Sequence, residues 1–112
     1  MTTLSMYRGD DRMLTITASE DLEGSEITFS AKRSTRDDAP VLISKSVRDG
    51  IAIGDPTTSA VVTLDAVDTA DLAPGTLFWD IEVVDVLGKV HTVATGKLRI
   101  RRDVTTQQAG GS

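Results

Sequence analysis

The feature that most constrains this chain is a pair of alternating stretches near its C-terminal end. Apolar or small residues recur at every second position through Leu77–Val83 and again through Val90–Ile100. A period of two places successive side chains on opposite faces of a β-strand, so each stretch predicts a strand with one buried face. The intervening Asp85-Val86-Leu87-Gly88 predicts a turn that ends on a glycine with positive φ. The sequence therefore predicts an antiparallel hairpin that organises the remaining strands.

The length of the hairpin loop sets the register of the two strands, and a slip of one residue would exchange their faces. A four-residue loop places Val84 opposite Lys89. The predicted inner pairs are Val83 with Val90, Ile81 with Thr92, Trp79 with Ala94 and Leu77 with Gly96. On the outer face the same register sets Glu82 opposite His91 and Phe78 opposite Thr95. Leu98 and Ile100 then extend past the partner strand, and we expect them to pair with the N-terminal segment.

Shorter alternating stretches predict the other strands of a sandwich. Their inward residues include Leu14, Ile16 and Ala18, then Ile27, Phe29 and Ala31, then Val62 and Leu64. A helical turn is expected near residues 68–75, capped by Asp68 or Thr69, with Leu72 closing the end of the core. This pattern predicts an all-β, immunoglobulin-like antiparallel β-sandwich of about seven to eight strands. The domain would span residues 1–106 and be followed by a flexible C-terminal tail at 107–112.

Composition narrows the classes of function. The 112 residues suit one domain, and the absence of cysteine removes disulfides, thiol nucleophiles and thiolate metal sites. A formal charge of −5 disfavours binding to nucleic-acid phosphates. The sequence contains neither a secretory signal pattern nor a run of roughly 20 apolar residues, so we expect no membrane partner and a protein that folds in a bacterial-type cytoplasm.

Residues that could carry chemistry are few. His91 is the single histidine, and a cross-strand polar pair with Glu82 accounts for it. The acidic groups at residues 65–71 and 10–11 lack the spacing of a calcium loop and suit turns and helix caps, as does Arg8-Gly9-Asp10. We therefore expect no enzyme activity, no cofactor and no metal.

Two sets of outward residues are candidates for protein contact. Phe78 is predicted on the outer face, where either a neighbouring loop covers it or it joins a contact patch with Val84 and Val93. The second set is a basic stripe at the end of the last strand, which suits either an acidic partner or solvent: Lys97, Arg99, Arg101 and Arg102.

At this point the chain resembles a known family, the small immunoglobulin-like domain of bacteriophage tail and baseplate proteins, of the type that begins baseplate upper proteins. The resemblance covers nearly the whole chain before the final tail. It is carried by turn glycines and strand alternation: Arg8-Gly9-Asp10, Asp21-Leu22 through Phe29, Gly50-Ile51, Asp80-Ile81, Gly88, Thr92, Gly96 and Asp103-Val104-Thr105.

The resemblance implies a non-catalytic virion structural protein, fixed in a symmetric oligomer on the tail, baseplate or head and contacting other virion proteins. Family members often head longer chains with receptor-binding parts, so a one-domain chain favours an adaptor or decorating role in the tail or baseplate. The alternatives are a capsid or tail-tube decoration protein and a carbohydrate-binding or adhesin-like β-sandwich, the latter motivated by Phe78 and the loops at 34–40 and 54–59.

Overall fold

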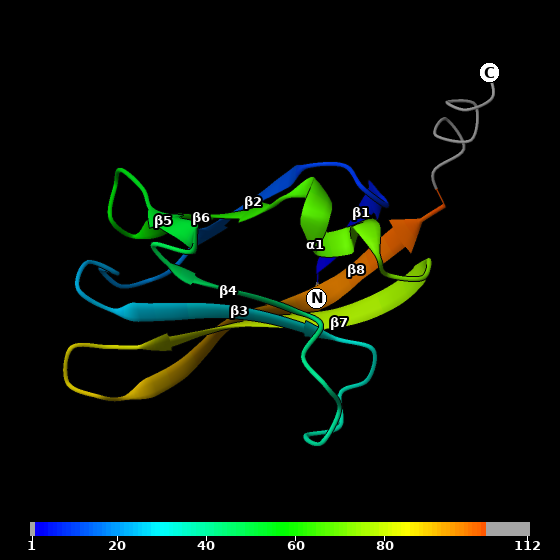
Figure 1. The fold of residues 1–112 in the computed structure, drawn as a ribbon. Helices are drawn as coiled ribbons and strands as arrows, with labels where there is room; N and C mark the ends of the chain where they lie inside the picture. Colours follow the sequence, from blue (N-terminus) through cyan, green and yellow to red (C-terminus); the bar gives the residue numbers. More distant parts are fainter. Residues whose placement is uncertain (1, 103–112) are drawn as a thin grey trace.

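Alternation produces strands along almost the whole chain. The computed structural model describes residues 2–102, and this part of the chain forms eight β-strands and one short helix (Figure 1). Their bounds are β1 Thr2–Tyr7, β2 Arg12–Thr17, β3 Glu26–Lys32, β4 Ile43–Val47, β5 Gly50–Ile53, β6 Ser59–Leu64, α1 Ala66–Ala70, β7 Gly75–Val84 and β8 Val90–Arg101. The prediction of an all-β fold is confirmed. The predicted tail at 107–112 and the domain boundary at 106 lie outside the described residues.

The strands form one mixed sheet that rolls into a nearly barrel-shaped body. Their order among residues 2–102 is β1-β8-β7-β3-β4-β5-β6-β2, so β1 and β2 are the two ends of the sheet (Figure 1). Neighbours are antiparallel except at β1–β8 and β4–β5, which are parallel. Among the described residues there is one helix, α1, and it is far too short to cross a membrane.

The rolled sheet encloses a core of side chains from the predicted inward positions. Ile27, Phe29 and Ala31 of β3 are fully buried, and Val62 and Leu64 of β6 join them. Trp79 is 4% exposed, and its ring lies 5.8 Å from that of Phe29, centroid to centroid. Burial of such apolar side chains is the main source of favourable free energy for a fold of this size.

The hairpin β7–β8 forms as predicted, but its register differs from the predicted one. Gly88 has φ of 85° and its N–H bonds the carbonyl of Asp85, while Asp85 itself pairs with Lys89, so the loop is one residue shorter than expected. Val84 therefore pairs with Val90 rather than with Lys89.

A β-bulge displaces the register once more. The irregularity lies between Ile81 and Glu82 on β7, where Val93 is the extra residue of β8. The observed pairs are Val83 with His91, Glu82 with Thr92, Ile81 with Ala94, Trp79 with Gly96, Phe78 with Lys97 and Leu77 with Leu98. The indole thus faces a glycine instead of Ala94. Bulges insert one unpaired residue and increase the local twist, which a strictly alternating sequence does not reveal.

The N-terminal strand β1 pairs with the edge of β8 that faces away from β7. Leu4 pairs with Leu98 and Met6 with Ile100, which confirms the predicted contact with the N-terminal segment. The prediction that Leu98 and Ile100 extend past β7 is wrong, because both also pair with residues of β7. Over residues 96–100, strand β8 is therefore flanked on both sides, and there only its alternate outward side chains reach solvent, whereas residues 90–93 are exposed.

The acidic turns close the end of the sheet beside α1. Asp65, not Asp68 or Thr69, is the N-cap of α1, and its backbone N–H bonds Asp68 Oδ2 at 2.6 Å. Asp11 Oδ1 accepts the N–H of Ala66 at 2.8 Å. Thr69 is fully buried, and its Oγ1 accepts the N–H of Gly9 in the Arg8-Gly9-Asp10 turn. These carboxylates and this turn hold backbone groups in place, as capping predicts.

Candidate functional site

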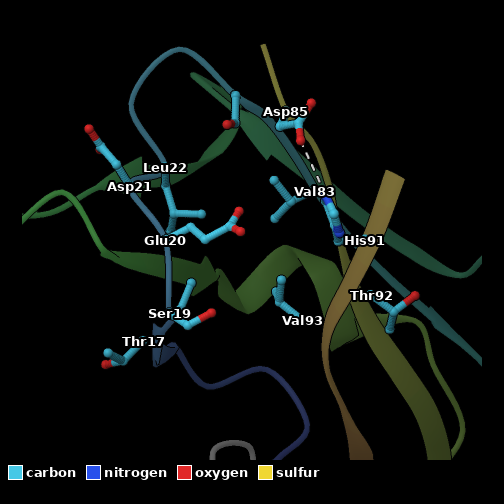
Figure 2. Close-up of a pocket in the computed structure, with 12 residues that line it drawn as sticks. Thr17, Ser19, Glu20, Asp21, Leu22, Val83, Asp85, His91, Thr92 and Val93 are labelled. Atoms are coloured by element: carbon cyan, nitrogen blue, oxygen red, sulfur yellow. Dashed lines mark hydrogen bonds and ion pairs between the residues drawn. The ribbon is translucent and has the colours of Figure 1, made fainter. Parts of the chain in front are cut away.

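The residues of β8 that precede the bulge lie at one end of the rolled sheet. There a cavity of about 350 Å³ opens between the β7–β8 hairpin and the loop that joins β2 to β3 (Figure 2). We call it the hairpin hollow. Its lining combines apolar and ionisable side chains, among them Glu20, Asp21, Leu22, Val83, Asp85, His91 and Val93.

His91 enters the hollow because of the register change. Residues directly opposite in a sheet share a face, and His91 pairs with the buried Val83. The prediction that His91 lies on the outer face opposite Glu82 is therefore wrong. Its Nε2 lies 3.1 Å from Asp85 Oδ2, a contact drawn in Figure 2. Among the described residues this is the one side-chain hydrogen bond of His91, so the imidazole is positioned by the turn.

Asp85 holds the hairpin turn together. Its Oδ1 accepts the backbone N–H groups of Leu87 and Lys89, each at 2.9 Å, and its Oδ2 faces His91. The pKa of Asp85 lies below its usual 3.8, first because the Lys89 N–H bonds the charged carboxylate and next because His91 does. With these partners the carboxylate of Asp85 is ionised at neutral pH. Both of its oxygens already have hydrogen-bond partners within the hairpin.

Replacing Asp85 by alanine is expected to lower the melting temperature at neutral pH, because the turn loses the acceptor of two backbone N–H groups. Since folding lowers the pKa of Asp85, its ionic contribution is present above the usual 3.8 and is lost as pH falls through the lower value of the folded state. The melting difference from wild type should shrink accordingly below pH 3.8.

Asp80→Ala is the matched control for this measurement, because Asp80 is an exposed aspartate of β7, the strand that leads into the turn of Asp85. Thermal melts followed by circular dichroism across pH check the result. A difference between Asp85→Ala and wild type that stays constant from neutral to acidic pH would contradict the role given to the carboxylate.

Glu20 is the carboxylate of the hollow that points inward. In Figure 2 its side chain extends from the β2–β3 loop toward Val83 and His91, whereas the side chain of Asp21 points away. Asp21 accepts the N–H of Glu23 at 3.0 Å, and this bond, with one from Thr57, lowers its pKa. Within residues 2–102 Glu20 forms no ion pair. The hollow therefore presents one uncommitted negative charge above the apolar Leu22 and Val83.

Exposed apolar side chains surround the tip of the same hairpin. Val86 is 72% exposed, Leu87 78% and Val90 60%. We call these three residues the apolar tip. Single exposed apolar residues are ordinary, but a group gathered on one projecting turn marks a surface suited to protein contact.

The predicted basic stripe lies on the outer surface of β8 at its C-terminal end. Lys97, Arg99 and Arg101 are exposed, and we call them the basic face; Arg102 is exposed immediately after them. Their direct partners on the two neighbouring strands carry no carboxylate and are Thr3, Ser5 and Tyr7 on β1 and Thr76 and Phe78 on β7. The positive charges are thus gathered on a face with short or aromatic neighbours.

The predicted patch of Phe78, Val84 and Val93 is not formed. Phe78 is half-buried, with Lys97 Nζ 5.8 Å from its ring centroid. Val84 lies on the same face of β7 but six residues away, about 20 Å along the strand. Val93 lies on the bulge and lines the hairpin hollow. Phe78 instead lines a depression together with Ser34, Thr35 and Val41 of the β3–β4 loop.

The sequence prediction missed a buried lysine. Lys45 lies on the inner face of β4 with a side chain only 10% exposed, and its Nζ is 2.8 Å from Asp68 Oδ2 and 4.0 Å from Asp65 Oδ2. The spacing from the buried Ile43 already places position 45 on the inner face. A basic residue at such a position is the signal of an internal ion pair.

Comparison with known proteins gives no relative. Neither a family model nor a curated protein matches this chain. Its candidate sites therefore rest on the geometry described above: the hairpin hollow with the apolar tip at one end of the sheet, and the basic face toward the other.

Proposed function

We propose that this protein is an immunoglobulin-like structural module of a bacteriophage particle, which assembles through protein contacts in the tail or baseplate. The strand order supports the fold assignment. It divides into a group β2-β6-β5 and a group β1-β8-β7-β3-β4, joined by two parallel residue pairs between β4 and β5. These groups correspond to the B-E-D and A′-G-F-C-C′ strands of an immunoglobulin-like sandwich.

One observation carries the assembly function. A single hairpin, β7–β8, bears both an exposed apolar tip and an exposed basic face, while its inward side chains such as Leu77, Trp79 and Leu98 are buried in the core. Apolar residues supply area to an interface, and clustered charge supplies orientation and choice of partner. Many such contacts, each weak, add together when copies repeat around the axis of a particle.

The resemblance to phage tail and baseplate domains supplies the setting. It implies a virion location and contacts with other virion proteins. Mass spectrometry and cryo-electron microscopy of purified particles of the source phage test this: we expect the chain in several copies per particle, with the β7–β8 hairpin in contact with a neighbour. Particles that lack the protein altogether would overturn the proposed function.

A second candidate function rests on the depression around Phe78. The aromatic ring lies between Lys32 and Lys97 on the neighbouring strands, with Asp80 and Thr95 lining the same depression. Aromatic rings beside polar side chains are suited to binding sugar rings. A glycan array distinguishes this candidate: binding that is lost in Phe78→Ala would support it, and an array without signal would remove it.

A further inference from the structure

We propose that the hairpin hollow receives the side chain of Arg99 from a second copy of this chain, so that copies dock head to tail. This inference rests on the proposed assembly function and names the partner of both surfaces. Three features carry it: the lining of the hollow, the presentation of Arg99, and the distribution of charge along the molecule.

The hollow suits a long cationic side chain. Leu22 and Val83 form an apolar wall, and Glu20 points across it without an ion-pair partner among the described residues (Figure 2). An arginine buries its methylene stem against apolar surface and directs its guanidinium to a carboxylate. Of the other two carboxylates of the lining, Asp21 accepts the N–H of Glu23 and points away, and Asp85 is held by its own turn, so Glu20 is the group left to receive the cation.

Arg99 is presented in the way that such a hollow requires. It is exposed on β8 and lies directly between Ser5 of β1 and Thr76 of β7, whose side chains are short. Lys97 and Arg101 lie two residues to either side on the same face. The middle cation of this stripe can therefore enter a cavity while the outer two meet the rim.

The distribution of charge favours a second copy as the occupant. Four connections lie together at the hairpin end of the sheet (Figure 1). These connections contain two cationic residues, Arg48 and Lys89. They contain six acidic residues: Glu20, Asp21, Glu23, Asp49, Asp55 and Asp85. The basic face lies toward the other end of a body 53 Å long. That end also holds carboxylates in the β1–β2 turn and at α1; Asp68 is paired with Lys45, and Asp10 and Asp11 line a depression with Arg101. The complementarity is thus local, between the carboxylates around the hollow and the three cations that project from one face of β8, and it favours a head-to-tail contact between copies.

The apolar tip adds contact area to this interface. Val86 and Leu87 directly follow Asp85, a lining residue of the hollow, and with Arg99 docked they face a partner surface that offers Tyr7 and the stems of its basic residues. The two surfaces in contact are different, so the interface is heterologous and generates a ring or an open chain of copies.

Sedimentation velocity of the purified protein tests the proposal. At about 0.01 M salt wild type should associate in a concentration-dependent way, and at about 1 M salt it should dissociate, because the screening length falls from about 30 Å to about 3 Å. Arg99→Gln and Glu20→Gln should each weaken association by about tenfold or more. Their matched controls, Arg36→Gln and Glu82→Gln, remove the same charge outside the two surfaces and should behave as wild type.

Mixing the Arg99→Gln variant with the Glu20→Gln variant gives the decisive result. Arg99→Gln keeps its hollow and Glu20→Gln keeps its arginine, so the mixture should form one-to-one dimers that neither variant forms alone. Wild type that stays monomeric at low salt, or a mixture without dimers, would overturn head-to-tail docking. A monomer that binds polyglutamate through Arg99 would overturn docking between copies and show that the partner of the basic face is another acidic protein. Either result leaves the virion test unaffected, since that test depends on the presence of the protein in particles.

Discussion

Replacing Trp79 by alanine is expected to lower the free energy of unfolding by about 4 kcal/mol, the typical cost of removing a large aromatic side chain from a core. The indole is 4% exposed, stacks on Phe29 at 5.8 Å and faces Gly96, a residue without a side chain that could move into the space. Urea denaturation followed by circular dichroism measures the change.

Trp79→Phe is the matched control. Phenylalanine keeps the ring against Phe29 and removes the indole Nε1–H, which is buried without a hydrogen-bond partner among the described residues. The cost should therefore be about 1.5 kcal/mol or less. A cost of Trp79→Ala below about 1 kcal/mol, as at a surface position, would show that the indole is not enclosed by the sheet.

The second large effect concerns the buried ion pair. Asp68→Asn is expected to destabilise the fold by about 3 kcal/mol, because the buried Nζ of Lys45 loses the carboxylate 2.8 Å away. Asp65→Asn should cost less than about 1 kcal/mol, since Asp65 is 4.0 Å from the ammonium, is mostly exposed, and asparagine caps a helix as well as aspartate does.

Lys45→Met separates the charge from the packing. It removes the buried cation and keeps an unbranched apolar stem, so stability should be unchanged or increased relative to wild type. Urea denaturation of the three variants under one set of conditions gives the comparison. If Lys45→Met is as destabilising as Asp68→Asn, the pair contributes net stability, and the desolvation argument is wrong.

The alternation of side chains predicted the strands well where one face is enclosed. Ile27, Phe29 and Ala31 are buried as expected, and Leu4 and Met6 lie beside β8. Burial fixes these positions because a shift of one residue would expose every apolar side chain of the strand. The class of fold is therefore legible from the sequence alone.

The register of the hairpin was not predictable in the same way. The stretch Val90–Ile100 alternates without a break, yet Val93 is an extra residue, and positions on its two sides face differently. Near the end of the hairpin no dense core penalises the bulge, since Val90 and Thr92 are exposed. The pairing there is coupled to the local twist of the strands, and a pattern of apolar and polar residues does not predict that twist.

The candidate site was predicted in part for the same reason. To predict the basic face, it was enough to know which side chains of a single strand point outward. Lys97, Arg99 and Arg101 are exposed as expected. The hairpin hollow has Glu20 and His91 in one lining although they come from distant segments, and the register change of the hairpin is what places His91 there. Such a juxtaposition depends on tertiary structure, and the spacing of residues along the chain does not contain it.

The bulge is the feature on which the hollow, and with it the docking proposal, depends most directly. Nuclear Overhauser spectroscopy on labelled protein measures it through contacts between β7 and β8. The structure predicts cross-strand contacts between Trp79 and Gly96 and between Val83 and His91. Contacts between Trp79 and Ala94 and between Glu82 and His91 would instead show an uninterrupted ladder with His91 on the outside, and would contradict the account.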